Sequence, residues 1–203
     1  MHDIRHAYQG IAALAHPSSG KNSKSIEGAS LMKQFAVTTA LLAAIAATPL
    51  IAAEDRVLDF PEGYKEDFTL YFTGDRVFED EQTIKIYGND IALEGVRKDG
   101  KLPDGSVLVA EIYAALKDSD GEVIESQIGR RVPGDFKAIA VMERQKGWDN
   151  QYPEELKVGD WEFEVFSTSG ENLGKDTTGC RECHHPLTDT EFTFSIEHLT
   201  AAK

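Results

Sequence analysis

The feature that most constrains this chain is a pentapeptide near its C-terminal end, Cys180-Arg181-Glu182-Cys183-His184. Its cysteines are the only two among the 203 residues, so no other thiol competes with them. C-x-x-C-H is the attachment signature for c-type haem. Thiols three positions apart can reach both vinyl groups at one edge of a porphyrin, and the next residue brings its imidazole to the iron. The motif predicts one haem c covalently attached through Cys180 and Cys183, with His184 as the proximal iron ligand.

Other chemistries also use closely spaced cysteines, and each suits this chain less well. A thioredoxin-like redox pair is typical of a βα unit early in a domain, whereas this motif follows a polar loop near the C-terminus. A structural zinc site needs four tetrahedral ligands, and the adjacent His184 and His185 cannot easily both join the cysteines. A disulfide is allowed in an exported protein, but it leaves the following histidine unexplained. The motif therefore favours haem.

The N-terminal region has the three-part pattern of a secretory signal peptide. Met32-Lys33-Gln34 supplies a short positive start, an apolar run rich in alanine and leucine follows, and small residues end it at Ala53. We predict a mis-assigned N-terminal extension over 1–31, a signal peptide over 32–53 that is cleaved after Ala53, and one mature domain over 54–203. An uncleaved membrane anchor is the alternative. The prediction places the mature protein in the periplasm, which agrees with the haem motif.

The formal net charge of −14 restricts the partners of the chain. It argues against nucleic acid, because a phosphate-binding surface needs clustered lysine and arginine. An acidic surface most often serves solubility. It can also steer the protein towards a basic redox partner.

Short apolar runs separated by turn signals predict a sheet. They cover residues 83–87, 107–113, 138–142 and 161–166. Helix is scarcer: residues 89–98 predict one, with Asn89 or Asp90 as its cap and Gly100 beyond its end. The fold class that follows is α+β, a mainly antiparallel sheet with a few short helices in a single domain.

The sixth coordination position of the iron decides what such a haem can do. His185 is next to the proximal ligand, His198 lies in the tail, and Met142 lies in an apolar strand where methionine usually fills core space. Since none stands out, we expect a five-coordinate iron with an open distal face, and only Met142 or His198 as sixth ligands if there is one. Several aromatic side chains could wall the distal face, although each by itself is more typical of a core: Phe68, Phe72, Tyr87, Tyr113 and Phe166.

The order of several short strings resembles the cytochrome P-460 and cytochrome c′-β superfamily. They include Phe60-Pro61-Glu62-Gly63-Tyr64, the stretch from Leu102 to Val109, the stretch from Gly159 to Phe163, the haem motif, and Phe192-Thr193-Phe194 after it. The resemblance covers nearly all of the predicted mature chain. It implies a mainly antiparallel β domain, often a homodimer, with one high-spin haem. Members either oxidise hydroxylamine, with a lysine cross-linked to the haem, or reversibly bind nitric oxide or carbon monoxide without the cross-link.

The chain departs from the oxidising members at the cross-linking slot. Where those members carry a lysine directly before a glutamate, this chain reads Val109-Ala110-Glu111. Ala110 cannot bond to a porphyrin carbon, so the resemblance favours a binder of small gaseous or nitrogenous ligands. Oxidation of hydroxylamine without the cross-link is one alternative, with Glu111, Glu143 or Glu162 as the proton acceptor if one of them does not simply face outward. Electron carriage through an iron ligated by Met142 is the other.

Overall fold

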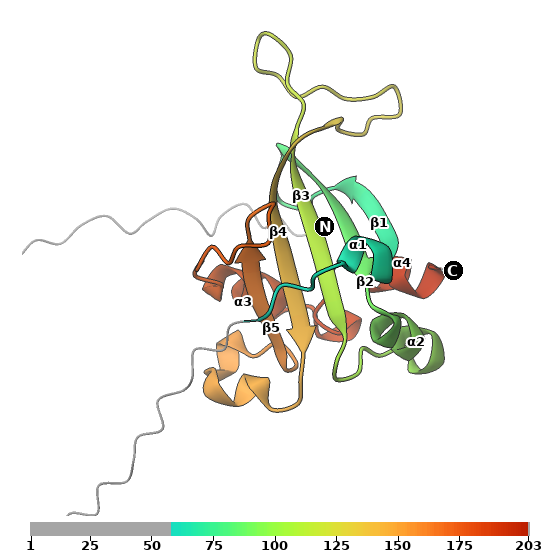
Figure 1. Ribbon diagram of the computed structural model, residues 1–203, viewed down its shortest axis with the longest axis vertical. Helices are drawn as coiled ribbons and strands as arrows, with labels where there is room; N and C mark the ends of the chain where they lie inside the picture. Colours follow the sequence, from blue (N-terminus) through green and yellow to red (C-terminus); the bar gives the residue numbers. More distant parts are fainter. Residues whose placement is uncertain (1–57, 203) are drawn as a thin grey trace, which may run out of the picture. The chain divides into compact units, whose positions relative to one another are not determined.

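The computed structural model describes residues 58–202, so the predicted extension, the signal peptide and its cleavage site lie outside the described part of the chain. The described residues form one antiparallel sheet in which each strand is hydrogen-bonded to the next along the chain (Figure 1). The strands are β1 (Thr69–Asp75), β2 (Gln82–Gly88), β3 (Val107–Ala115), β4 (Pro133–Arg144) and β5 (Trp161–Phe166).

All helices among the described residues are short, and none of them is long and apolar enough to cross a membrane. The α-helices are α1 (Tyr64–Asp67), α2 (Asp90–Asp99), α3 (Thr178–His184) and α4 (Ile196–Ala201), and the 3₁₀ turns are η1 (Trp148–Gln151), η2 (Glu154–Leu156) and η3 (Thr188–Thr190). The predicted α+β class, a mainly antiparallel sheet with a few short helices, is confirmed.

The caps predicted for α2 are those that the structure uses. The Asn89 side chain accepts a hydrogen bond from the Ala92 N–H at 3.0 Å, which satisfies one of the free donors of the first turn. Gly100 ends the helix with a left-handed backbone, φ 67°, which glycine adopts without a steric penalty. The helix lies beside α4 and the start of β3, because its one apolar side packs into the core there.

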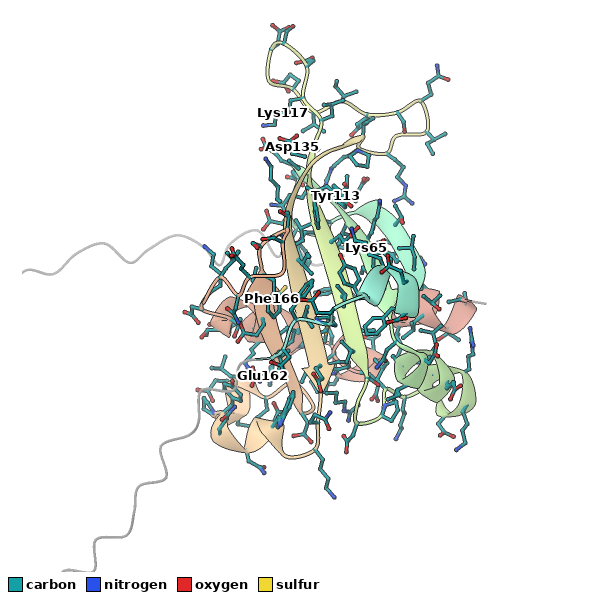
Figure 2. The ribbon with its side chains drawn as sticks, in the orientation of Figure 1. Lys65, Tyr113, Lys117, Asp135, Glu162 and Phe166 are labelled. Carbon is teal, nitrogen blue, oxygen red and sulfur yellow. The ribbon has the colours of Figure 1, made fainter. Side chains whose placement is uncertain are left out.

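The two faces of the sheet carry separate cores, because side chains alternate along each strand. On β3, Leu108 packs on one face and Val109 on the other. We call the first the α3 face, since Cys180 of α3 packs against its core, and the second the α1 face, since Tyr64 of α1 covers it. Figure 2 shows Lys65 and Phe166 on the side of the sheet that α1 crosses. The α3-face core is Ala92, Leu93, Val96, Leu102, Leu108, Val158, Trp161, Phe163 and Leu199, and the α1-face core is Leu58, Tyr64, Tyr87, Val109, Ile139, Val141 and Phe166.

The connection between β3 and β4, residues 116–132, projects beyond the sheet as two small loops (Figure 1). Short bridges close the loops, one between Lys117 and Val123 and one between Glu125 and Arg131. The Arg131 guanidinium donates to the carbonyl oxygens of Glu79 and Gln82 at 2.7 and 3.0 Å. The projection is therefore fastened at its base to the connection between β1 and β2.

Candidate functional site

The whole pentapeptide lies on α3, a helix of seven residues. Because residues three apart in a helix share a side, the two cysteines point to the same side of α3. Cys180 is half-buried against the α3-face core, Cys183 is exposed, and neither forms a disulfide. Burial raises the pKa of the Cys180 thiol. The structure thus brings the two predicted attachment residues and the predicted ligand together on one short element.

One hydrogen bond orients the imidazole of His184. Its Nδ1 lies 2.6 Å from the backbone carbonyl oxygen of Phe192. Because a carbonyl oxygen only accepts, Nδ1 carries the proton and Nε2 keeps a free lone pair. Burial also lowers the pKa of His184, which favours the neutral ring. A neutral imidazole whose second nitrogen donates to a carbonyl is the form in which histidine ligates a metal.

The carbonyl that His184 uses belongs to a strained turn. Glu191 and Phe192 both have left-handed backbones, with φ of 52° and 60°. Such conformations cost a non-glycine residue about 1–3 kcal/mol each and persist where surrounding contacts hold them. The Trp161 indole donates to the Glu191 carbonyl oxygen at 3.1 Å, and Arg144 pairs with the Glu191 carboxylate at 2.7 Å. The strain is located where it directs a backbone acceptor at the candidate iron ligand.

A close approach at Gly159 supports the same turn. A Cβ built on Gly159 would lie 2.4 Å from the Phe192 ring, well inside van der Waals contact. Gly159 also has φ +68°, and the following Asp160 has a positive φ of 68°. The two residues before β5 therefore bend so that Phe192 can pack directly on the backbone.

Aromatic rings surround His184 on two sides. The rings of Phe163 and Phe194 each have their centroid 5.0 Å from the imidazole, in edge-to-face geometry. Phe78 meets Phe194 with centroids 6.2 Å apart and is 80% exposed. Phe163 belongs to the alternating pattern of β5 and Phe194 follows the motif closely, so both had a signal in the sequence. Phe78, in a polar connection with a left-handed backbone, had none.

Most of the aromatic residues considered for the distal wall lie on the other face of the sheet. Those in or against the α1-face core are Phe68, Tyr87 and Phe166. Tyr113 is also there, because its hydroxyl donates to Glu111. Phe72 alone of this set is on the α3 face, where its strand partner Ile86 pairs in turn with Ala110. The core role that the sequence allowed for each of these residues fits Tyr87 and Phe166, and a pattern of alternation does not say which of the two faces a site occupies.

The α3 face of the central strands is made of small and aliphatic side chains. Ala110 pairs with Ile86 on β2 and with Ala140 on β4, so the three side chains share this face, and all three are half-buried. Ala140 lies two residues from Met142, the strand partner of Phe163. Lys85 is on the α1 face, where its ammonium lies 5.0 Å from the Tyr113 ring centroid. An apolar surface on the same face as a half-buried histidine and paired thiols fits a haem, and Ala110 belongs to that surface.

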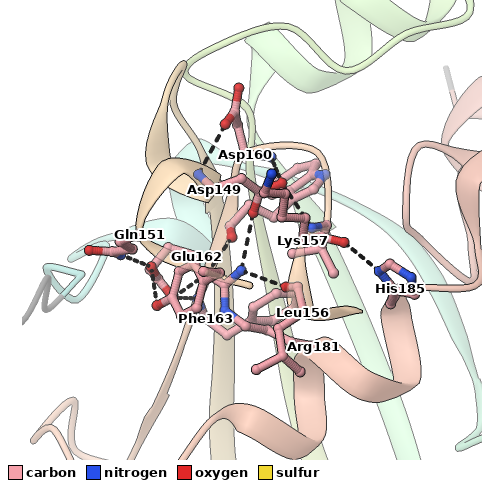
Figure 3. Close-up of polar contacts among 12 residues, drawn as sticks. Asp149, Gln151, Leu156, Lys157, Asp160, Glu162, Phe163, Arg181 and His185 are labelled. Atoms are coloured by element: carbon pink, nitrogen blue, oxygen red, sulfur yellow. Dashed lines mark hydrogen bonds and ion pairs between the residues drawn. The ribbon is translucent and has the colours of Figure 1, made fainter. Parts of the chain in front are cut away.

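The three candidate sixth ligands have different surroundings. Met142 packs against the α3-face core. His198 is exposed, with its ring 4.6 Å from that of Phe72. His185 directs Nδ1 at the Lys157 carbonyl oxygen, 2.7 Å away, so its ring points to the segment after η2 (Figure 3).

The carboxylates considered as proton acceptors do not lie on the face where His184 packs. Glu111 is 1% exposed on the α1 face, where it pairs with Lys65 at 2.8 Å and accepts from Tyr64 at 2.7 Å. Glu162 is 2% exposed and half-buried Glu143 accepts from Gln145. The expectation that these residues face outward is wrong for Glu111 and Glu162. Each face of the sheet carries a core, so a strand residue that points away from one core can be buried on the other side.

Two comparisons with known proteins bear on this site. A family model described as Cytochrome P460 matches residues 61–195. The matched stretch contains the five strands, α3 and the turn that holds His184. A search of curated proteins returned no match.

Proposed function

The chain belongs to the cytochrome P460 family, whose members are haem c cytochromes, and on this premise we propose that it is an exported mono-haem cytochrome that binds a small gaseous ligand. Cys180 and Cys183 hold the haem through thioether bonds, and His184 is the proximal ligand. Nitric oxide and carbon monoxide are the ligands that suit an open ferrous site. The protein works in the periplasm after cleavage of residues 32–53 as a signal peptide.

The observation that carries the proposal is the hydrogen bond from His184 Nδ1 to the Phe192 carbonyl. When bound, the haem supplies an iron that takes a diatomic molecule as an axial ligand. The chain supplies an imidazole in one tautomer, with Nε2 free, and packs that ring between Phe163 and Phe194. The two thioether bonds and this histidine would hold the group without a second protein ligand.

The surroundings of the candidate sixth ligands support an open distal face. A side chain that competed with the gas for the iron would have to lie away from His184 and be free of other contacts. Met142 is the strand neighbour of Phe163, which packs edge-on against His184 itself. His185 is committed to the Lys157 carbonyl, and His198 is an exposed residue of a terminal helix.

The residue at the cross-linking slot supports gas binding over hydroxylamine oxidation. Ala110 faces the same side of the sheet as His184 and carries only a methyl group, which supports a site without the cross-link. The candidate carboxylates are on other surfaces and engaged in their own hydrogen bonds. Nothing polar on β3 is placed on the α3 face to accept a proton there.

Absorption spectra of the ferrous holoprotein, matured in an exporting host, test the proposal. We expect a broad high-spin spectrum that shifts when carbon monoxide is added, and the same behaviour in Met142→Leu and His198→Ala. A sharp low-spin spectrum that ignores carbon monoxide contradicts the proposal. Conversion of that spectrum to high spin by one of the two substitutions would identify the ligand.

Electron carriage is a second candidate because an exposed aromatic path leads to the ligand. Phe78, which is mostly exposed, contacts Phe194, and Phe194 contacts His184. Three acidic residues, Glu79, Asp80 and Glu81, follow Phe78 and could dock a basic partner. This role requires rapid reduction and reoxidation by a partner protein, with a rate that falls as salt is added. A rate that does not depend on salt contradicts it.

A further inference from the structure

Arg181, the first residue between the two cysteines, is buried to an unusual degree for a charged side chain. It is 1% exposed, whereas arginine is almost never fully buried unless it is paired. Its guanidinium donates to Glu162 Oε1 at 2.7 Å and to Asp149 Oδ1 at 3.2 Å (Figure 3). Glu182, the other residue between the cysteines, is exposed. The two variable positions of the motif therefore have opposite environments.

Backbone and aromatic contacts complete the surroundings of Arg181. It donates to the carbonyl oxygens of Trp161 at 2.8 Å and Leu156 at 3.2 Å. The guanidinium carbon also lies 3.3 Å from the ring centroid of Tyr152, a stacking distance. Arg181 thus connects α3 to η1, η2 and the first residues of β5 at once.

The partners of Arg181 are themselves held by further hydrogen bonds. The Asp149 carboxylate accepts from the N–H groups of Val158 and Asp160 at 2.9 and 2.8 Å. The Glu162 carboxylate accepts from the Tyr152 hydroxyl at 2.8 Å. Arg181 therefore docks into a preorganised acidic pocket rather than into two mobile side chains.

The pocket is continuous with the residues that hold His184. Glu162 stands between Trp161, whose indole fixes the Glu191 carbonyl, and Phe163, whose ring packs on the imidazole. A movement of α3 relative to the start of β5 would change both contacts. A helix of seven residues has little stability of its own, so its position depends on such tertiary contacts.

We propose that Arg181 is a positioning residue: by binding Glu162 and Asp149 it fixes α3 against β5 and so sets the orientation of His184 at the iron. The inference rests on the haem-attachment part of the proposed function and does not depend on which ligand the iron binds. It assigns a structural task to one variable position of the motif and none to the other. A buried ion pair adds little net stability when its desolvation is counted, and in some proteins it fixes one arrangement of the chain, which is the effect proposed here.

Matched substitutions at the two variable positions test the proposal. Arg181→Met and Glu182→Met each place one methionine, which is long and uncharged, at a variable position of the motif. The two holoproteins and the wild type are produced in an exporting host and compared. The measurements are haem bound per polypeptide, the reduction potential and circular dichroism of the Soret band. These signals exist whether the iron is five- or six-coordinate, so they stay informative if carbon monoxide shows that the open-site proposal is wrong.

We expect Arg181→Met to lower haem per polypeptide several-fold and to shift the potential and the Soret dichroism of the haem that is attached, while Glu182→Met matches the wild type. Arg181→Lys keeps the charge but not the planar set of donors, so its potential and dichroism should remain shifted. Wild-type values in Arg181→Met, or equal changes in both methionine variants, would overturn the proposal.

A variant without buried unpaired charges covers the case in which Arg181→Met fails to fold. The triple substitution Arg181→Met, Glu162→Gln, Asp149→Asn removes all three charges together. Shifted potential and dichroism in this folded protein support a positioning role. A return to wild-type values would show that Arg181 only neutralises the carboxylates, and the proposal would be wrong.

Discussion

At the scale of single residues, the site depends on the backbone acceptor for His184 more than on the motif alone. The pentapeptide supplies thiols and an imidazole, but the tautomer of that imidazole comes from Phe192, eight residues later. Phe192 presents its carbonyl from a left-handed conformation. Trp161 and Gly159 take no part in ligation, but they hold the turn that orients the His184 imidazole.

Gly159→Ala tests this dependence. The new Cβ would meet the Phe192 ring at 2.4 Å and would also occupy a backbone with φ +68°. We expect a loss of about 2–4 kcal/mol, from about 1–3 kcal/mol of overpacking and about 1 kcal/mol of backbone strain. Gly121→Ala is the control, because Gly121 has φ +86° but nothing within 4 Å of its Cβ position. Denaturant unfolding of both holoproteins measures the difference, and equal losses would show that the contact with Phe192 has no effect.

Glu111 gives the protein a predicted pH dependence. Burial raises its pKa, but hydrogen bonds from Lys65, Tyr113 and Tyr64 outweigh burial and hold the pKa below the ordinary value of 4.5. A carboxyl with a lowered folded-state pKa stabilises the protein above its unfolded pKa, and this stability is lost as the pH falls through the folded value. We therefore expect the free energy of unfolding to decline below pH 4.5.

Glu111→Gln removes this contribution. The substitution should cost about 1–3 kcal/mol at neutral pH, because buried donors lose a charged acceptor, and it should flatten the acid decline. Glu143→Gln, at a half-buried carboxylate on β4, should leave both nearly unchanged. Chemical unfolding between pH 3 and pH 7 measures both effects. An acid decline of wild-type steepness in Glu111→Gln would assign it to other carboxylates.

At the scale of elements, the sequence predicts what depends on local chemistry. The strands β2 to β5 follow apolar runs, and α2 follows its asparagine cap and its terminal glycine. The cap also accepts from the Val107 N–H at 3.1 Å, which joins α2 to β3. Such signals act over a few residues and survive in any tertiary context.

The rest of the site depends on residues that are distant in the chain. Arg181 meets Asp149 across 32 positions, and Tyr64 meets Glu111 across 47. No local pattern marks a charged residue as buried when its partner comes from another element. The face of the sheet on which a strand residue lies is also not marked locally: Tyr87 and Phe166 lie on the opposite side from His184.

Asn89→Ala measures how much the cap of α2 contributes to the stability of the protein. The side chain bonds the Ala92 and Val107 N–H groups and donates to the Gly105 carbonyl at 2.8 Å. Loss of a cap costs about 1–2 kcal/mol, and the added bonds to the β3 side place this residue at the upper end. Asp90→Ala, an exposed first-turn position, is the control and should cost less than half as much. Thermal unfolding compares them, and equal shifts would contradict the double role of Asn89.

Ala110→Phe tests the apolar surface of β3. A large ring on the α3 face beside Ile86 and Ala140 would occupy the surface that we assign to the porphyrin. We expect a several-fold loss of attached haem at little cost in secondary structure. Thr73→Phe, on the exposed part of β1 opposite Lys85, adds the same ring to the other face. Equal haem content in the two variants would mean that the porphyrin lies elsewhere.

At the scale of the whole molecule, we propose that residues 32–53 are removed before the protein functions. A cleaved leader predicts that the holoprotein purified from an exporting host begins at Glu54. N-terminal sequencing and intact mass measure this directly. A chain that keeps residues 32–53 and sediments with membranes would instead support the anchored alternative. Cytoplasmic expression should yield protein without covalent haem.

The hydrogen bond between His184 and Phe192 can form only after the C-terminal part of the chain is in place, so it forms late in folding. If the chain is exported as we propose and leaves the channel N-terminus first, Asp149 and Glu162 emerge before the motif and Phe192 emerges after it. Arg181 can dock α3 while the imidazole is still free to turn. At the time of haem attachment the tautomer of His184 would then not be fixed, and the residues that emerge next would fix it.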